Sequence, residues 1–269
     1  MSMIDPYGQR SDYGPWRWLH RLNPLGKAFA PLPFMVLLIF TRDIATPFAF
    51  LALGLTIVLA GAHLNRTTVA IVLGLPVLVV VMTFTFGLWA RPELVEHTPA
   101  LLTIGGYTLY LGSLEIGLAT ALRLTALVSL TLIGGLTTTG PDLVRSMIQH
   151  LKVPYRIGYT ALAAYRFVPR FGHELQVIRS AHRVRGMAGG RGPIAATQRT
   201  LGYVVPLLAG AIRHAERVAM AMDSRAFGAY RTRTERHLIP FRARDWVFIV
   251  AFITASLAIL VATTPFNQL

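Results

Sequence analysis

Residues 68–90 read TVAIVLGLPVLVVVMTFTFGLWA, and none of their side chains is charged. In an α-helix, about 20 apolar residues cross the roughly 30 Å of hydrocarbon in a lipid bilayer. Further apolar runs lie on both sides of this one, at residues 32–41, 48–64, 110–136 and 246–263. The first of them is long enough only when residues 27–33 are counted with it. The sequence therefore predicts an all-α membrane protein with about five transmembrane helices.

The composition agrees with a membrane location. Of the 269 residues, 54% are hydrophobic and only 14% are charged, and the mean hydropathy is +0.52. Soluble proteins carry about 25% charged residues. The net charge is nonetheless +14, which indicates one concentrated basic part. The sequence has no cysteine, which excludes disulfides, iron–sulfur clusters, thiolate zinc sites and cysteine nucleophiles.

The positive charge is concentrated in residues 141–245, which hold 18 of the 26 Lys and Arg residues and +12 of the net charge. Cytoplasmic loops of membrane proteins are enriched in Lys and Arg. We therefore expect the N-terminus and residues 141–245 to be cytoplasmic and residues 91–106 to lie outside. The chain then has three parts: an N-terminal segment with four transmembrane helices (1–140), a cytoplasmic region (141–245) and a C-terminal transmembrane helix (246–269).

The cytoplasmic region is predicted to fold into about three helices, because its arginines alternate with apolar residues at helical spacing. Proline and glycine interrupt this pattern at Pro154, Pro169, residues 186–193, Pro206 and Gly228. We expect one helix at about 170–185 and another at about 205–225.

The helix expected at 205–225 carries apolar residues separated alternately by four and three positions. This spacing is typical of a seam that packs against another helix. The seam residues are Leu208, Ile212, Ala215, Ala219 and Met222. Small neighbouring residues keep this helix thin, so a second helix could cross it closely.

Both cytoplasmic helices end with an arginine close to glycine. One ends Arg183-Val184-Arg185-Gly186, and the other ends Asp223-Ser224-Arg225-Ala226-Phe227-Gly228. Ordinary helix capping explains either end alone, since a cation in the last turn and a following glycine both stabilise a helix terminus. The repetition of this ending on two long cytoplasmic helices favours docking, because arginine makes bidentate contacts with carboxylates and contacts with backbone carbonyls.

Motifs along nearly the whole chain resemble the transmembrane T component of energy-coupling factor (ECF) transporters. They are Leu22-Asn23-Pro24-Leu25-Gly26-Lys27, Phe167-Val168-Pro169-Arg170-Phe171, Ala181-His182-Arg183-Val184-Arg185-Gly186, Pro206-Leu207-Leu208 and Ala221-Met222-Asp223-Ser224-Arg225-Ala226-Phe227-Gly228. The resemblance implies an all-helical scaffold in the prokaryotic cytoplasmic membrane, with long coupling helices that cross in an X.

The same resemblance implies the partners. Two ABC-type ATPase subunits would each receive one signature arginine in a groove, and a substrate-binding membrane S component would rest on the coupling helices. ATP-driven motion of the ATPase subunits would then reach the S component and drive uptake of a vitamin or a metal ion.

The signature arginines carry over to Arg185, followed by Gly186, and to Arg225. Val184 and Ser224 stand where the family commonly has alanine, and Ala226 stands where it has glycine. Alanine disfavours a left-handed backbone, so Gly228 is the alternative terminator of the second helix. Asp223 either orients Arg225 or is a solvated charge.

The chain has no nucleotide site of its own. A phosphate-binding loop needs the pattern Gly-x4-Gly-Lys-Ser/Thr, and neither of the two lysines, Lys27 and Lys152, lies in one. The chain is therefore predicted to be a non-catalytic subunit without a cofactor, with ATP hydrolysis in partner subunits. No metal site is expected, because the histidines do not form a His-Glu-x-x-His motif.

Two charged residues lie within the apolar run 110–136. Arg123 and Glu115 are costly in hydrocarbon, so they either face the bundle interior or contact the S component.

Three other classes of protein are alternatives. A self-contained transporter would carry internal repeats, and the unequal charge of the two halves argues against them. A membrane-anchored basic scaffold would bind anionic lipid or nucleic acid. Nucleic acid is not expected, because the arginines are interleaved with apolar positions. An integral membrane enzyme would need a constellation of catalytic groups, and none stands out in the sequence.

Overall fold

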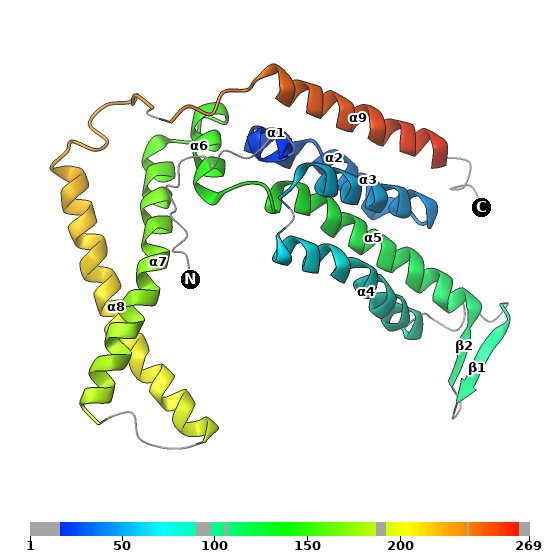
Figure 1. Ribbon diagram of the computed structural model, residues 1–269, viewed down its shortest axis with the longest axis horizontal. Coiled ribbons are helices and arrows are strands. Elements are labelled where there is room, and N and C mark those ends of the chain that lie inside the picture. The colour runs from blue at the N-terminus through cyan, green and yellow to red at the C-terminus, as the bar shows by residue number, and fades with distance from the viewer. Residues whose placement is uncertain are drawn as a thin grey trace. The chain divides into compact units, whose positions relative to one another are not determined.

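The computed structural model describes residues 17–63, 65–89, 98–104, 107–186, 192–235 and 237–263 (Figure 1). The elements are a 3-10 helix Trp18–Arg21, α1 Pro24–Phe29, α2 Leu32–Phe40, α3 Ala45–Gly61, α4 Arg66–Leu88, β1 Ala100–Ile104, β2 Tyr107–Tyr110, α5 Leu111–Gly135, α6 Gly140–His150, α7 Tyr155–Val184, α8 Pro193–Asp223 and α9 Ala243–Thr263.

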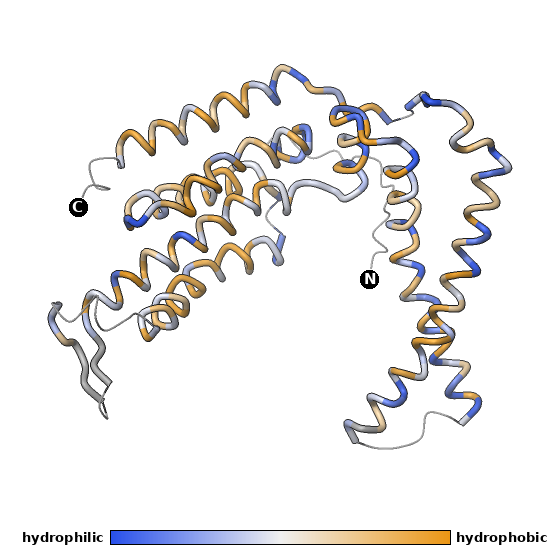
Figure 2. Tube along the Cα trace, turned by 180° about the vertical axis from the view of Figure 1, so that it is seen from behind, coloured by the Kyte–Doolittle hydropathy of each residue, from blue (hydrophilic) through white to orange (hydrophobic). Residues whose placement is uncertain are grey.

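The described residues divide into two compact units. Residues 17–143 and 239–263 form one, which we call the apolar unit, and residues 144–238 form the other, which we call the crossed-helix unit. The first boundary lies within α6. Figure 2 shows the contrast in hydropathy between the hydrophobic helices of the apolar unit and the mixed surface of α7 and α8.

The core of the apolar unit lies around α5, which packs against α1, α2, α3 and α4. Leu122, Ala126, Leu130 and Ile133 recur every three or four residues along α5, and all four are buried. This spacing places them on one face of the helix. A cluster of aromatic rings completes the core, in which Phe34 lies 6.0 Å from Phe50 and 5.9 Å from Phe252 between ring centroids.

The outer surfaces of these helices are apolar. On α4, Val77, Val80, Val81 and Phe84 are each more than half exposed. Side chains of this kind suit contact with lipid, and a continuous surface of them is rare in a protein surrounded by water. Among the described residues, α4, α5 and α9 are long and apolar enough to cross a membrane, and two apolar helices, Pro24–Phe40 and Ala45–Gly61, are shorter. The predicted all-α membrane fold is confirmed.

The hairpin formed by β1 and β2 is an addition to the predicted fold. The two strands pair antiparallel, with Thr103 opposite Thr108 and Ile104 opposite Tyr107. They precede α5 directly, so part of the segment that the sequence indicated as a loop or as the start of a helix is extended.

Glycine allows the helices of the apolar unit to approach closely. A Cβ atom at Gly117 would overlap the Thr83 carbonyl oxygen and lie 2.8 Å from the Gly87 nitrogen. The backbones of α4 and α5 therefore come into direct contact, as is common where small residues line the interface between membrane helices.

A buried polar cluster lies around the first turn of α1. Lys27 is 1% exposed, and its Nζ donates hydrogen bonds to the Leu19 carbonyl at 3.1 Å and to the Thr137 carbonyl at 2.9 Å. The backbone N–H of Asn23 donates to the Asp245 carboxylate at 2.6 Å, and its side-chain amide donates to the Ile239 carbonyl at 3.1 Å. These bonds connect α1 to the end of α5 and to the segment that leads into α9.

In the crossed-helix unit, α7 and α8 are continuous long helices that cross each other (Figure 1). The predicted breaks at Pro169 and Pro206 are wrong, because both prolines lie inside helices. A proline removes one backbone hydrogen bond and bends a helix. Here both helices continue through their prolines, α7 to Val184 and α8 to Asp223.

Candidate functional site: two arginine tips and an arginine-lined pocket

The crossing of α7 and α8 is built from aromatic and small residues. The rings of Phe167 and His214 stack at 4.5 Å, and those of His182 and Tyr203 meet edge to face at 5.2 Å. Between these two contacts Gly210 is buried, and a Cβ atom there would lie 3.2 Å from the carboxylate of Glu174. The two helices therefore run antiparallel where they touch, and the glycine permits the close approach.

This contact uses other residues of α8 than the expected seam does. Leu208 and Ile212 are 56% and 60% exposed, Ala215 and Ala219 are also exposed, and only Met222 is partly covered. The predicted seam therefore does not pack against α7. The cause is the chemistry of the true contact, which uses a glycine and aromatic rings where a seam is expected to use aliphatic side chains.

The tip of α7 has the geometry of a left-handed helix cap. Gly186 has a φ of +72°, and its N–H bonds to the Arg183 carbonyl at 3.1 Å. Arg185 comes directly before it, and its N–H bonds to the Ala181 carbonyl at 3.1 Å. Both Arg185 and Val184 are exposed. The first signature arginine therefore projects from the C-cap position, directly after Val184, the last residue of α7.

The tip of α8 has the same geometry with a different residue. Ala226 has a φ of +54°, its N–H bonds to the Asp223 carbonyl at 2.9 Å, and the N–H of Phe227 bonds to the Met222 carbonyl at 3.0 Å. These two bonds form a Schellman motif, whose left-handed position is usually glycine. Arg225 precedes Ala226 as Arg185 precedes Gly186, so the two signature arginines occupy equivalent positions.

The left-handed conformation is therefore present at Ala226 despite its side chain. Gly228 is left-handed as well, with a φ of +89°, and turns the chain a second time. Asp223 is exposed, and among the described residues no hydrogen bond or ion pair joins its carboxylate to Arg225. Asp223 therefore does not orient Arg225 in this structure.

The segment after α8 is fastened to α6 and α7. The hydroxyl of Tyr155 donates to the Tyr230 carbonyl at 2.5 Å, the guanidinium of Arg156 donates to the Gly228 carbonyl, and the side chain of Gln149 donates to the His237 carbonyl at 2.8 Å. Three successive parts of the segment are held in this way, so its backbone has a defined path beside the start of α7.

A fourth bond joins the Tyr159 hydroxyl to the Glu235 carboxylate at 2.5 Å. Burial and then this hydrogen bond raise the pKa of Tyr159 to about 12. The phenol therefore remains a hydrogen-bond donor throughout the physiological pH range. The guanidinium of Arg233 lies over the same ring, 4.5 Å from its centroid.

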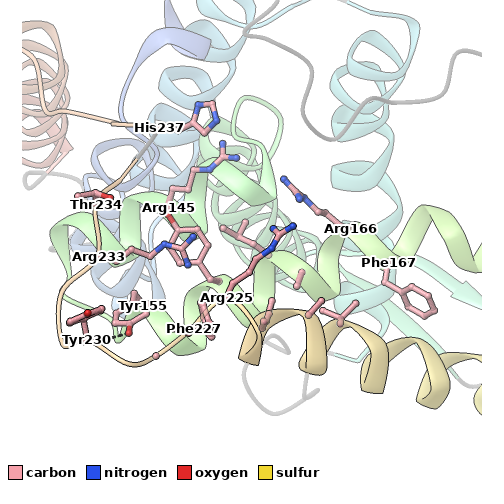
Figure 3. Close-up of a pocket in the computed structure, with 18 of the residues that line it drawn as sticks. Arg145, Tyr155, Arg166, Phe167, Arg225, Phe227, Tyr230, Arg233, Thr234 and His237 are labelled. Carbon is pink, nitrogen blue, oxygen red and sulfur yellow. Dashed lines mark hydrogen bonds between the residues drawn. The ribbon is translucent and has the colours of Figure 1, made fainter.

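A pocket of about 920 Å³ lies between this segment, α6, α7 and α8 (Figure 3). Among the described residues its lining includes five arginines and two histidines and no acidic side chain; the basic residues are Arg145, Arg166, Arg170, Arg225, Arg233, His214 and His237. The floor is apolar, with Leu162, Val218 and Met222. Burial lowers the pKa of Arg166. The second signature arginine thus belongs to a cationic pocket, whereas the first lies at an open tip.

Sequence reasoning did not find this pocket. One signal was present on α7. Four residues of the pocket lining are separated by four, three and four positions, so they share one face of this helix: Tyr155, Tyr159, Leu162 and Arg166. The contributions of Arg145 and of the segment after α8 depend on tertiary folding and leave no periodic pattern.

The two intramembrane candidates lie on α5 in different surroundings. Glu115 is exposed. Arg123 is partly buried, and its Nε is a buried atom without a hydrogen-bond partner among the described residues. The structure does not pair these two residues with each other.

The comparisons with known proteins agree with this architecture. The family of cobalt transport proteins named CbiQ matches residues 15–236, which include both arginine tips and all of the pocket lining except His237. A relative from Bifidobacterium longum (strain NCC 2705), named a putative ABC transporter ATP-binding protein, is 29% identical over 264 residues. That match covers 90% of this chain and 31% of the relative.

Two further relatives are named energy-coupling factor transporter transmembrane protein EcfT. The one from Thermosediminibacter oceani is 30% identical over 248 residues, which cover 89% of this chain and 90% of the relative. The one from Bacillus subtilis (strain 168) is 26% identical over 244 residues, with 87% and 90% covered. The apolar helices, the two tips and these matches together place the chain in the CbiQ family, as a transmembrane T component of energy-coupling factor transporters.

Proposed function

We propose that this T component couples two ABC-type ATPase subunits to a substrate-binding S component, for uptake of a vitamin or a metal ion. The observation that carries the proposal is the equivalence of the two helix tips. Arg185 and Arg225 each stand directly before a left-handed residue at the end of a long helix, and both are exposed. Two helix tips with the same geometry are suited to bind two similar ATPase subunits.

Each tip supplies a guanidinium that contacts a groove in one ATPase subunit. Arginine is suited to this role because its planar fork binds carboxylates and backbone carbonyls with defined geometry. ATP binding would close the two ATPase subunits and so move both tips. ATP hydrolysis would occur in these partners, since the sequence contains no phosphate-binding loop.

The contact at the crossing makes α7 and α8 move together. The stacked rings of Phe167 and His214 and the close approach at Gly210 fix α7 against α8. Close-packed contacts of this kind deform little, so displacement of one tip moves the other helix as well.

The exposed residues Leu208, Ile212, Ala215 and Ala219 form an apolar stripe on α8 that α7 does not cover. We propose this stripe as a contact surface for the S component. Arg123 is a further candidate contact, because a guanidinium Nε that is buried without a partner favours an incoming acceptor.

The relative from Bifidobacterium longum supports the ATPase partnership. This chain matches about a third of that longer protein, whose name describes ATP binding. A segment similar to this T component thus occurs within one polypeptide that carries an ATP-binding name.

The test is affinity purification of the tagged protein from its native membrane, followed by mass spectrometry of the proteins that accompany it. The variants are Arg185→Glu, Arg225→Glu and the double variant. We expect two ATPase subunits with the wild type, weaker retention with each single variant, and loss of both ATPases from the double variant. A small membrane partner should remain with every variant.

Arg213→Glu and Arg217→Glu are the matched controls. Both arginines are exposed on α8 away from its tip, and neither lines the pocket. They should retain the ATPase subunits. Loss of the ATPases from these controls would mean that general positive charge, and not the tips, carries the contact. If the wild type brought no ATPase, the coupling function itself would be refuted.

A further inference from the structure

The polar cluster on α1 holds the two segments through which the chain passes between its units. The first segment follows α5 and leads through Thr137 into α6, and the second leads through Ile239 into α9. Lys27 is hydrogen-bonded to the first segment and Asn23 to the second. Both segments are therefore bound to one turn of α1, from Asn23 to Lys27.

Lys27 is bound by the oxygen atoms of neutral groups. Its Nζ donates hydrogen bonds to the Leu19 carbonyl at 3.1 Å, to the Thr137 carbonyl at 2.9 Å and to the Thr137 hydroxyl at 3.1 Å. These bonds use all three donors of the ammonium group. Lys27 is 1% exposed, and among the described residues no carboxylate forms an ion pair with it. A buried charge without a counter-ion is costly, so stability alone does not explain a lysine here.

The second segment is held by groups that are buried as well. The side-chain amide of Asn23 donates to the Ile239 carbonyl at 3.1 Å, and its backbone N–H donates to the Asp245 carboxylate at 2.6 Å. The other carboxylate oxygen of Asp245 accepts a hydrogen bond from the backbone N–H of Arg242 at 2.6 Å. Asn23, Ile239 and Asp245 are each no more than 5% exposed. If either segment moved away from α1, buried polar groups would lose their partners, which is costly.

These bonds make α1 a mechanical connection. This helix also packs against α5 and α9. A pull on either segment therefore moves α1 together with its neighbours or breaks hydrogen bonds in the buried cluster. Because the broken bonds would not be replaced by water, joint movement is favoured.

We propose that Asn23 and Lys27 are positioning residues through which displacement of α7 and α8 reaches the membrane helices α5 and α9. The proposal rests on the proposed coupling function, because ATP-driven motion of the two tips supplies the displacement. Lys27 transmits it from the segment after α5, and Asn23 transmits it from the segment before α9. Without these bonds the two segments absorb the motion, and the membrane helices stay in place.

The experiment uses the complete complex, purified from its native membrane with its partner subunits and placed in nanodiscs. The chain has no cysteine, so pairs of introduced cysteines carry spin labels, and single-cysteine variants correct for labels on partner subunits. The membrane pair is Val80→Cys on α4, whose backbone contacts α5, and Val250→Cys on α9. The coupling pair is Ser180→Cys on α7 and Arg217→Cys on α8. All four positions are exposed. Electron paramagnetic resonance measures both distances without nucleotide and with ATP plus vanadate.

Two substitutions remove one connection each. Lys27→Met removes the ammonium group and keeps an unbranched side chain. Asn23→Ser removes the bond to the Ile239 carbonyl and keeps the cap of α1, because serine caps a helix as asparagine does. Lys152→Met is the matched control, since Lys152 is the other lysine of the chain, is exposed, and loses the same charge.

With ATP and vanadate, we expect both distances to change in the wild type and in Lys152→Met. In Lys27→Met and Asn23→Ser the distance of the coupling pair should still change, while the change in the membrane pair is lost. Without nucleotide, Asn23→Ser should have the membrane distance of the wild type, which a merely structural defect would alter. This variant keeps the test valid if Lys27→Met does not fold.

An equal response of the membrane pair in the wild type, Lys27→Met and Asn23→Ser would overturn the proposal. A wild type in which only the coupling pair responds would overturn it too, and both results leave the coupling function standing. Loss of the response in Lys152→Met as well would assign the effect to net charge and not to these bonds. If the coupling pair did not respond in the wild type, the coupling function would be refuted, and this proposal with it.

Discussion

Ala226 occupies a position that usually belongs to glycine. A left-handed backbone brings the Cβ atom close to the carbonyl oxygen, which costs an L-residue roughly 1 kcal/mol. Here the φ of +54° is compensated by the hydrogen bonds to the carbonyls of Asp223 and Met222 that close the helix. The second tip therefore has its geometry at a cost that the first tip, with Gly186, avoids.

Ala226→Gly should stabilise the second tip by roughly 0.5–1 kcal/mol, because it relieves this strain. Hydrogen exchange of the backbone amides of Phe227 and Ala229 should become slower. The control is Ala219→Gly in the exposed helical part of α8, where glycine costs about 1 kcal/mol. The two substitutions should therefore have opposite effects, and a shared direction would contradict the assignment of strain.

His20 responds to pH. Its Nε2 accepts a hydrogen bond from the backbone N–H of His63 at 3.1 Å, which requires the neutral ring. Burial, followed by the positive charge of Lys27, lowers the pKa of His20 from 6.5 to about 4. The unfolded chain therefore takes up a proton at higher pH than the folded chain does. The stabilising contribution of His20 is full above pH 6.5 and is lost as the pH falls toward 4.

Thermal unfolding of the purified protein should show this dependence between pH 7.5 and pH 4, a range set by the shifted pKa of His20. His20→Gln should lower the melting temperature at pH 7.5 and reduce the slope below pH 6.5. His173→Gln, an exposed position on α7, should leave the slope as it is in the wild type. Equal slopes for the wild type and His20→Gln would disprove a role of His20.

At this scale the sequence predicts where the two arginines lie better than it predicts the backbone conformation beside them. The arginines at 185 and 225 and the glycine at 186 are visible in the motifs and are found at the helix tips. The left-handed conformation of Ala226 was not expected, because alanine by itself disfavours a positive φ. Only the hydrogen bonds that close the end of α8 stabilise this conformation. Arg145 and Arg233 belong to the pocket through tertiary folding alone.

Among the helices, the contact between α4 and α5 depends on the absence of side chains. The backbone of α5 at Gly117 lies against Thr83 and Gly87 of α4. In a membrane, where lipid is as apolar as leucine, helices associate through close van der Waals contact of this kind. Added volume at Gly117 must therefore force the two helices apart.

Gly117→Ala should destabilise the protein by about 2 kcal/mol, within the range known for overpacked interiors. Gly74→Ala is the matched control, because a Cβ atom there would meet nothing within 4 Å. This control should leave the stability unchanged or raise it by up to about 1 kcal/mol, since alanine is the better helix former. Thermal unfolding of both variants in the same detergent measures the difference. A Gly117→Ala variant as stable as the Gly74→Ala variant would show that the interface can relax.

The elements differ in how well the sequence predicts them. Long uncharged runs such as residues 68–90 are predicted well, because their length is determined by the thickness of the bilayer. The contact face of α8 differs from the expected seam, because the expected pattern counted aliphatic residues while the contact uses Gly210 and His214. The prolines at 169 and 206 were expected to end helices that in fact continue through them.

For the molecule as a whole, the distribution of charge predicts its orientation. The natural absence of cysteine makes this testable, because an introduced cysteine is the only thiol in the chain. Trp89→Cys lies at the end of α4, next to the segment expected outside, and Ser180→Cys lies on α7, which is expected to be cytoplasmic. Both positions are exposed.

On intact cells, a membrane-impermeant maleimide should label Trp89→Cys and leave Ser180→Cys unlabelled. Permeabilised cells should show labelling of both variants, because the reagent then reaches the cytoplasmic side. The cysteine-free wild type is the background control. Labelling of Ser180→Cys on intact cells would reverse the orientation that the positive charge predicts.

The polar cluster on α1 has a consequence for the topology of the chain. The chain leaves the apolar unit shortly after Thr137 and returns at Ile239, and both residues are hydrogen-bonded within one turn, from Asn23 to Lys27. Insertion of a domain into another is tolerated when the two chain ends that flank the insertion lie close together in the receiving domain. Both ends of the crossed-helix unit, residues 144–238, therefore leave the apolar unit beside the same helix, α1, which is the arrangement of an inserted domain.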